Sequence, residues 1–364
     1  MENGKKVIRN SNVELLRIIA MFMIIGHHYS YYGGFEYDTA TISFNRMWYQ
    51  FLLMGGKIGA NIFLVISAWF LTGVENVPYK KLQKLWGQIS FYAIVLLSVS
   101  FFLNEISGKA IVKALFPISF EQWWYASGYF ILLLMVPFLN KWIQSVNRED
   151  YRKFVCIATV LWTVIPTFTG QKVQSNMLVW FVYLYLLVAY IKKYNVLNKV
   201  SASKCLRVAV GFYVITYLSS IVFDVIGTRV PLFGNKAEHF YDIQSITVLG
   251  VAIFSLLYVV KEKEHYVGMI NGIAQLTFGI YLIHDNSNVR NFLWNVFGNK
   301  SFQSATCFPV ISLGVILATF IVCAFIEWLR VKCFEKAYLN IVEKICGKFW
   351  MVVKHIVGRI KSDN

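Results

Sequence analysis

The sequence has few charged residues and few prolines for its length. Only 15% of its 364 residues are charged and six are proline, whereas 57% are hydrophobic. A soluble globular domain carries about 25% charged residues. The apolar segments are long enough to cross a bilayer, and they recur along the whole chain. The composition therefore excludes a soluble domain and predicts an all-α, polytopic membrane protein.

Motifs that depend on cysteine, glycine or clustered ligands are missing as well. The six cysteines form no CxxC pair and mostly lie in or beside apolar segments, so we expect packing or lipid-facing residues, not disulfides or metal ligands. There is no glycine-rich phosphate loop, GxSxG motif or metal-ligand cluster, and the simplest expectation is chemistry without a metal. The basic start MENGKKVIRN leads into an apolar segment without a small-residue cleavage site, so we expect the first span to be retained.

Ten apolar segments of roughly 17 to 23 residues are candidate transmembrane helices. They lie near 12–32, 56–74, 85–103, 123–140, 154–170, 176–191, 206–226, 243–260, 271–288 and 308–329. Basic residues are concentrated in alternate connections, among them Lys80, Lys81, Lys84, Lys141, Arg152, Lys192, Lys193, Lys204, Lys261 and Lys263. The opposite connections carry fewer, namely Arg46, Lys57, Lys109, Lys113, Lys172, Arg229, Lys236, Arg290 and Lys300. This asymmetry predicts that both termini are cytoplasmic, and it accounts for the net charge of +16 without a nucleic-acid partner.

The last segment, 331–364, alternates apolar and basic residues at helical spacing. Two interpretations remain open: an amphipathic helix lying on the anionic inner leaflet, or a soluble helix packed on the cytoplasmic loops. No internal repeat or linker divides the chain. We therefore expect one transmembrane domain over 1–330, followed by this basic cytoplasmic tail.

The first span, LLRIIAMFMIIGHHY at 15–29, carries polar groups that lipid disfavours. Arg17 and His28 are eleven positions apart, so in a helix they share a face about 16 Å apart, with Glu14 one turn before Arg17. His27 is offset by about 100°. Arg17 can either reach the headgroups as a pair with Glu14 or line a cavity. We expect His28 to face a polar cavity, where an imidazole can accept and return a proton during acyl transfer.

This first span resembles the first helix of the membrane-bound acyltransferase 3 family, whose signature is an arginine, ten residues and a histidine; the match selects Arg17 and His28. Segments 59–73, 123–140 and 276–284 resemble later helices of the family, in the same order. The resemblance extends from about residue 12 to residue 330. It implies transfer of an acyl group, most often acetyl, from cytoplasmic coenzyme A thioesters to hydroxyls of glycans or other acceptors.

The sequence departs from the family pattern at two places. Ala68 replaces the usual glycine after Ser67, and Leu64 replaces the second aromatic residue. Ser67 can bond a carbonyl one turn back or, as the resemblance implies, line the pore. Lys81 and Lys84 stand where many members carry two arginines; they bind the coenzyme A phosphates or are ordinary loop lysines.

Two later residues are candidates for supporting roles. His284 ends the ninth span near the outer surface, where it orients the acceptor or the catalytic imidazole, or is an interfacial residue. Glu327 lies at the depth of Arg17, and we expect a charge pair that joins the first and tenth spans, or a role in donor binding. Aromatic residues on the outer side form an interfacial belt, and some can stack on a sugar; they are Tyr31, Tyr32, Phe35, Tyr37, Trp48, Tyr49, Trp123, Trp124 and Tyr125.

Together these observations predict a multi-pass O-acetyltransferase of the cell membrane that uses acetyl-CoA and no metal. The expected acceptor is a hydroxyl of a cell-surface polysaccharide or its lipid-linked precursor, with His28 as general base or acyl acceptor. Two alternatives remain: a transporter or flippase for lipid-linked sugars, and a non-catalytic sensor of the same fold. The absence of a repeat and the scarcity of proline within spans disfavour the transporter. The acceptor, the acyl chain length and the oligomeric state are left open by the sequence.

Overall fold

The computed structural model describes residues 9–38, 40–102, 106–234 and 236–345, which form an α-helical bundle without strands. The longer helices are α1 (Ser11–Tyr32), α2 (Phe44–Leu71), α3 (Tyr79–Phe101), α5 (Trp124–Ser145), α6 (Arg148–Thr159), α8 (Met177–Lys193), α9 (Ala202–Gly227), α10 (Ile246–Lys261) and α14 (Phe308–Leu329). The shorter ones are α4 (Gly108–Leu115), α7 (Ile165–Thr169), α11 (Gly268–Ala274), α12 (Thr277–His284) and α13 (Arg290–Val296). Single turns of other helix types complete the chain: η1 (Val160–Val164), η2 (Pro231–Phe233), η3 (His239–Tyr241), η4 (Asn299–Phe302) and η5 (Arg330–Phe334).

Short polar side chains set the starts of several helices. In each case the side-chain oxygen accepts a hydrogen bond from a backbone N–H of the first turn, which otherwise has no partner. The capping residues are Asn10 for α1, Ser43 for α2, Ser107 for α4, Asn147 for α6, Asn176 for α8 and Ser201 for α9. At the end of α7, Gly170 adopts a φ of 69°, a left-handed conformation that favours glycine.

Seven helical stretches in the described residues are long and apolar enough to cross a membrane. They are Phe44–Leu71, Tyr79–Phe101, Trp124–Ser145, Arg148–Thr169, Ala202–Gly227, His239–Lys261 and Phe308–Ile345. The other three predicted spans are also helical, but α1 carries several polar residues, α8 has 17 residues, and α11 and α12 are separated at Gln275–Leu276. The chain is thus an all-α, multi-pass membrane protein, and the count of about ten spans and the side of each terminus stay predictions.

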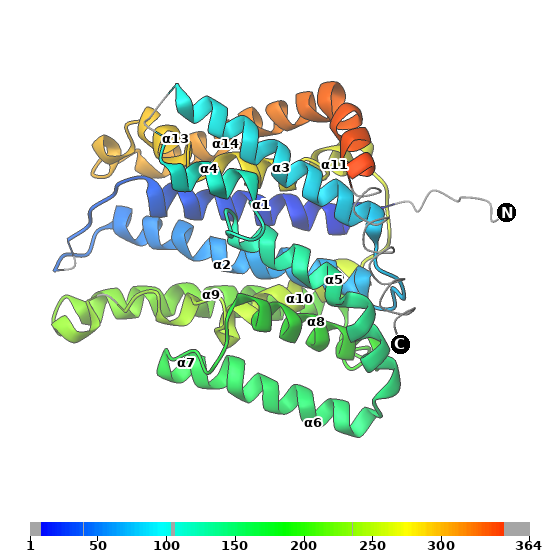
Figure 1. The fold of residues 1–364 in the computed structure, drawn as a ribbon. Helices are drawn as coiled ribbons and strands as arrows, with labels where there is room; N and C mark the ends of the chain where they lie inside the picture. The colour runs from blue at the N-terminus through cyan, green and yellow to red at the C-terminus, as the bar shows by residue number, and fades with distance from the viewer. Residues whose placement is uncertain (1–8, 39, 103–105, 235, 346–364) are drawn as a thin grey trace.

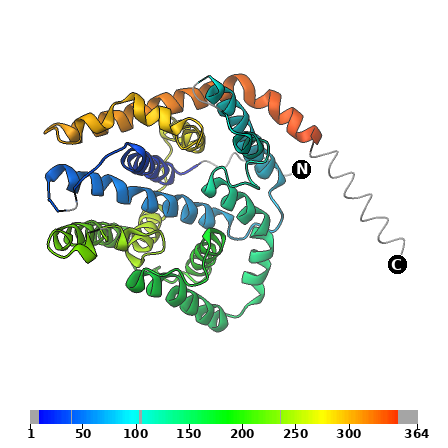
Figure 2. The same ribbon diagram turned by 60° about the vertical axis from the view of Figure 1, so that its left-hand side comes forward.

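The long helices run roughly side by side, with α1 and α2 in the middle of the bundle (Figure 1). We call the end where α1 begins and α14 ends the proximal end, and the end where α1 ends and α2 begins the distal end. On one side of this central pair lie α3, α12 and α14; on the other lie α8, α9 and α10 (Figure 1). The turned view shows α1 in dark blue between α14 in orange and α2 in lighter blue (Figure 2).

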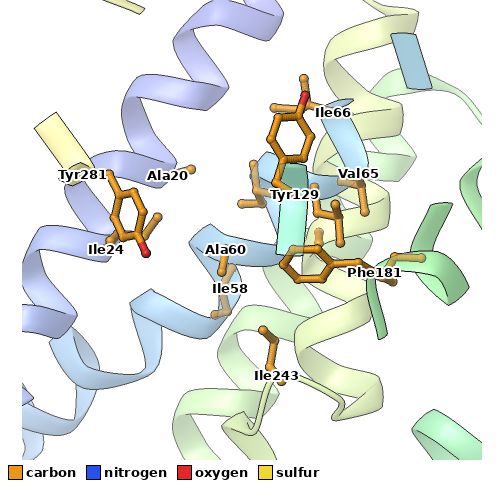
Figure 3. Close-up of a cluster of buried hydrophobic side chains, with 14 of the residues drawn as sticks. Ala20, Ile24, Ile58, Ala60, Val65, Ile66, Tyr129, Phe181, Ile243 and Tyr281 are labelled. Atoms are coloured by element: carbon orange, nitrogen blue, oxygen red, sulfur yellow. The ribbon is translucent and has the colours of Figure 1, made fainter. Parts of the chain in front are cut away.

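Apolar side chains fill both sides of α2, which is the most buried of the seven candidate spans. On one side Tyr281 of α12 lies beside Ile24 of α1, and on the other Val65 lies near Tyr129 and Phe181 (Figure 3). All five belong to one continuous buried cluster. Because α1 and α2 are held from both sides, polar groups on their surfaces have fixed positions.

The prediction that Arg46 and Lys57 belong to outer connections is wrong. The Ser43 cap starts α2 twelve positions before the predicted apolar segment, so both residues lie within the helix. Arg46 is only 3% exposed, and its guanidinium donates to the Asp224 carboxylate of α9 at 2.7 Å and to the backbone carbonyl of Asp38. An internal ion pair, not a loop, therefore accommodates this charge.

The described part of the basic tail continues α14 as a helix through η5 to residue 345. Its Glu335 carboxylate accepts from Lys84 of α3 at 2.7 Å and from Arg330 at 2.8 Å. Tyr338 packs against Gly87, where an added Cβ would lie 2.9 Å from the tyrosine ring. Residues 335–345 thus pack on α3, whereas 346–364 lie outside the described residues. The boundary at residue 330 and the amphipathic character of the tail stay predictions.

Candidate functional site

A cavity of about 480 Å³ lies in the distal half of the bundle. Both His27 and His28 line it from α1, and Lys57 lines it from α2. It extends inward to Met21, at the middle of α1, and the exposed Tyr31 lies at its rim. The cavity is walled by residues from segments far apart in the sequence: α1, α2, α4, the start of α5, the segment before η3, α12 and the start of α13.

A chain of two hydrogen bonds fixes the orientation of His28. His28 is 7% exposed, and its Nδ1 lies 2.9 Å from Nε2 of the fully buried His284 of α12. The Nδ1 of His284 lies 2.6 Å from the carbonyl oxygen of Ile280. A carbonyl only accepts, so this Nδ1 carries the proton and the Nε2 of His284 must accept from His28. His28 therefore keeps an unprotonated Nε2, the form of imidazole that acts as a base.

An acidic group lies close to that free nitrogen. The Oδ1 of Asp285 is 3.7 Å from the Nε2 of His28, and both residues line the cavity. Arg290 lies 3.7 Å from the same carboxylate oxygen and donates to the Tyr32 hydroxyl at 2.8 Å. If His28 gained a proton, the carboxylate of Asp285 would stabilise the charged imidazole. Arg290 holds that carboxylate in place. Sequence reasoning missed Asp285 and Arg290 as site residues, although Asp285 directly follows His284.

His27 reaches the same cavity through a different contact. Its Nδ1 donates to the Leu53 carbonyl at 2.5 Å, and its ring stacks on Tyr31 with centroids 5.7 Å apart. Gly56 of α2 makes room for the ring, because a Cβ there would lie 2.2 Å from the Cγ of His27. The two histidines have different partners, as their offset around the helix predicts, but both line the cavity.

Arg17 and Glu14 lie together toward the proximal end. The Nε of Arg17 is 3.6 Å from Oε2 of the buried Glu14, which also lies 3.9 Å from Arg9. Arg17 lies one helical turn before the cavity residue Met21. Arg17 therefore lies one turn to the proximal side of the cavity and does not line it.

The two predicted phosphate-binding lysines have separate surroundings. Lys81 donates to the Tyr129 hydroxyl at 2.8 Å, and the Tyr129 ring stacks on Tyr125 with centroids 6.3 Å apart. Lys81, Tyr129 and Tyr125 thus form a row from the proximal end to the cavity. Lys84 is paired with Glu335 at 2.7 Å.

Ser67 and Glu327 lie outside the cavity. Ser67 is half-buried, one turn beyond the lining residue Phe63 on the same face of α2. The expected pair between Glu327 and Arg17 is wrong. Glu327 is 1% exposed, and it accepts from Arg330 at 2.7 and 2.8 Å and from Tyr92 of α3 at 2.6 Å. The cation paired with Glu327 is therefore Arg330, three positions later along the same chain. The bond between Glu327 and Tyr92 joins α14 to α3.

Charged residues at the cavity rim were also missed by the sequence reasoning. Lys57 makes no hydrogen bond or ion pair with the described residues, and it lies near Glu238, which lines the cavity from the segment before η3. Glu238 is exposed at the rim, yet partial desolvation by the cavity walls raises the pKa of its carboxyl; Lys57 opposes this rise and Asp242 reinforces it. The rim therefore holds both signs of charge. Lys57 stands at the start of an apolar segment in the sequence, so it was interpreted as a loop residue.

Comparison with known proteins gives one match. The family described as "Acyltransferase domain" matches residues 10–328, from the cap of α1 to the penultimate residue of α14. Neither the curated proteins nor the solved structures contain a match to this chain. The matched range includes both histidines, Asp285 and all the other residues that line the cavity.

Proposed function

This chain belongs to the acyltransferase 3 family and is a membrane acyltransferase; we propose that it transfers an acetyl group from acetyl-CoA to a hydroxyl of a cell-surface polysaccharide or its lipid-linked precursor. The cavity at the distal end is the reaction site. We place the proximal end in the cytoplasm and the distal end outside the cell membrane. The acceptor then enters from the distal end and the donor from the proximal end.

The observation that carries this proposal is the chain of hydrogen bonds from Ile280 through His284 to His28. It leaves the Nε2 of His28 unprotonated and facing a cavity large enough for a sugar ring. A general base must be fixed in the correct tautomer within reach of the proton that it removes. The buried carboxylate of Asp285, 3.7 Å away, stabilises the imidazolium that forms.

Two routes use this base. In direct transfer, Nε2 of His28 takes the proton of the acceptor hydroxyl, and the oxygen attacks the thioester carbonyl carbon. The C–S bond breaks, and the thiolate of coenzyme A takes the proton back from His28. In the second route Nε2 itself attacks the thioester carbonyl carbon, and the C–S bond breaks to release the thiolate. The acceptor oxygen then attacks the acyl carbon and displaces neutral imidazole, and the hydroxyl proton goes to the thiolate. Both routes yield one ester and one free thiol.

Contacts at the proximal end support a path for the donor. Basic residues gather where α3 begins, and Lys81, Tyr129 and Tyr125 lead from there to the cavity. Lysine ammonium groups attract the phosphates of coenzyme A. Arg17, one turn from the inner end of the cavity, positions the pantetheine arm. The donor thus extends from Lys81 and Lys84 toward His28, and Ser67 lies on the continuing face of α2.

The test is release of free thiol from acetyl-CoA by the purified protein in nanodiscs, in the presence of glycan acceptors. We expect His28→Ala to lose about 10²- to 10⁴-fold in kcat, the usual contribution of a general base. His27→Ala is the matched control, because its Nδ1 is bonded to Leu53 and not to the relay. Equal kcat in both variants and the wild type would contradict the proposal, and sugar movement without thiol release would indicate a transporter.

A further inference from the structure

One polar side chain in the cavity wall is buried without a hydrogen-bond partner. Gln122 is 8% exposed and lines the cavity, yet neither its Nε2 nor its Oε1 has a partner among the described residues. Buried amides in proteins are nearly always hydrogen-bonded, because leaving one unpaired costs free energy. Gln122 thus brings an unpaired donor and an unpaired acceptor to the wall of the cavity.

The next residue adds a second free donor. Trp123 is 1% exposed and lines the cavity, and its indole Nε1 also lacks a partner. In contrast, the buried indole of Trp180 donates to Asn61 at 3.0 Å. An indole N–H can only donate. Gln122 and Trp123 therefore offer adjacent donors together with one acceptor.

The backbone holds this pair in place. Glu121 has a φ of 46°, an uncommon left-handed conformation for a residue other than glycine. The N–H of Gln122 donates to the Pro117 carbonyl at 2.9 Å, so the main chain is bonded while the side chain is not. Strained backbone of this kind persists where surrounding structure fixes it, and it is concentrated at functional sites. The turn at Glu121 directs Gln122 and Trp123 to the cavity from the start of α5.

We propose that Gln122 and the indole N–H of Trp123 form the subsite that selects the acceptor, by binding hydroxyl groups adjacent to the one that is acetylated. This inference rests on the proposed function. The two groups are neutral, and each sugar hydroxyl can accept from the indole or amide N–H and donate to the amide oxygen. The acceptor is therefore a pyranose with neighbouring hydroxyls, in contrast to a simple alcohol.

Binding can be measured without turnover. We would titrate methyl α-glucopyranoside, methyl α-galactopyranoside and methyl α-mannopyranoside onto the full chain in nanodiscs by saturation-transfer NMR, with empty nanodiscs as background. Tetrahydropyran-4-ol, a ring with a single hydroxyl, is the reference probe. The variants are Gln122→Met, which keeps the side-chain length, and Trp123→Phe. Gln244→Met is the control, since Gln244 is also a buried glutamine, its amide donates to Ser175, and it lies outside the cavity.

We expect at least one methyl pyranoside to bind the wild type more tightly than tetrahydropyran-4-ol does. Losing one hydrogen bond should weaken that binding roughly three- to tenfold in each variant, with little change for tetrahydropyran-4-ol or acetyl-CoA. The proposal is overturned if the wild type does not favour any pyranoside, if both variants bind as the wild type does, or if acetyl-CoA binding weakens instead.

Thiol release in the same samples separates this inference from the proposed function. If the pyranoside preference depends on Gln122 while the wild type releases no thiol with the sugars that bind, the subsite stands and the proposed reaction fails. If thiol is released and the variants change neither KM nor binding for the sugar, the reaction stands and the subsite fails.

Discussion

Replacement of His284 tests the tautomer argument most directly. His284 contacts neither donor nor acceptor in the proposed reaction, because it is fully buried behind His28. Its proposed role is to accept the Nδ1 proton of His28 while it donates to Ile280. His284→Leu removes both bonds without leaving a large void. His28 can then carry its proton on Nε2, where it no longer acts as a base.

The expected size of the effect follows from two contributions. One hydrogen bond between neutral groups is worth about 1 kcal/mol, or roughly fivefold. Loss of the fixed tautomer adds to this; partners that orient a functional imidazole through its second nitrogen are worth about 10- to 100-fold in metal sites. We therefore expect His284→Leu to lower kcat by about 10- to 100-fold, with the KM for acetyl-CoA changed by less than about threefold.

The assay is thiol release in nanodiscs, with His284→Gln as the matched variant. A glutamine amide oxygen can accept from His28 while the amide N–H donates to Ile280, so this variant should retain most of the activity. In the double variant His28→Ala/His284→Leu the second change should add little, because the two residues act as one unit. Wild-type kcat in His284→Leu, or fully multiplicative losses in the double variant, would refute the relay.

Three further predictions concern stability. Glu327→Gln breaks a buried ion pair and should lower the free energy of unfolding in SDS titrations by about 3 kcal/mol, whereas Glu149→Gln, which breaks an exposed pair with Lys153, should cost less than about 1 kcal/mol. Gly279→Ala places a Cβ 2.2 Å from the pinned Glu327 carboxyl carbon and should cost about 1–3 kcal/mol by the same titration; Gly272→Ala meets nothing within 4 Å and should be neutral or stabilising. Glu238→Gln should raise the thermal midpoint only slightly, because solvent screens this exposed carboxyl, and the gain should grow as pH rises above the ordinary carboxyl range, since the raised pKa of Glu238 means that its ionisation destabilises the fold; a gain that shrinks with pH would contradict this.

Local patterns predicted the helices and singled out His28, which lines the cavity and which we propose as the base. The length of the apolar segments predicted the long helices, because a helix in lipid satisfies its own backbone hydrogen bonds. The spacing between Arg17 and His28 correctly placed them apart on one helix, with His28 at the cavity and Arg17 toward its inner end. The sequence left three roles open for His284, namely orienting the acceptor, orienting the His28 imidazole, or lying at the interface; its Nε2 is 2.9 Å from the Nδ1 of His28.

Pairings between distant segments were not predictable from one sequence. Glu327 was matched with Arg17 by depth alone, whereas Arg330, three positions later, is within reach on the same helix. The Arg46 pair with Asp224 joins residues 178 positions apart. No sequence motif marks Gln122. Its proposed role rests on the folded structure, in which its buried amide has no hydrogen-bond partner. Burial and the absence of a bond are properties of tertiary packing.

The neighbouring histidines show how packing assigns function to similar residues. His27 and His28 share the same helix and almost the same depth, and each has its Nδ1 bonded and its ring at the cavity. They differ in the group that accepts the Nδ1 proton. His27 donates to a backbone carbonyl of α2, whereas His28 donates to the imidazole of His284. The carboxylate of Asp285 lies beside the other ring nitrogen of His28. Only His28 has a negative group within 4 Å to stabilise a gained proton. The partners of His28 come from the end of α12 and the residue after it, more than 250 positions away, so the spacing within α1 cannot predict them.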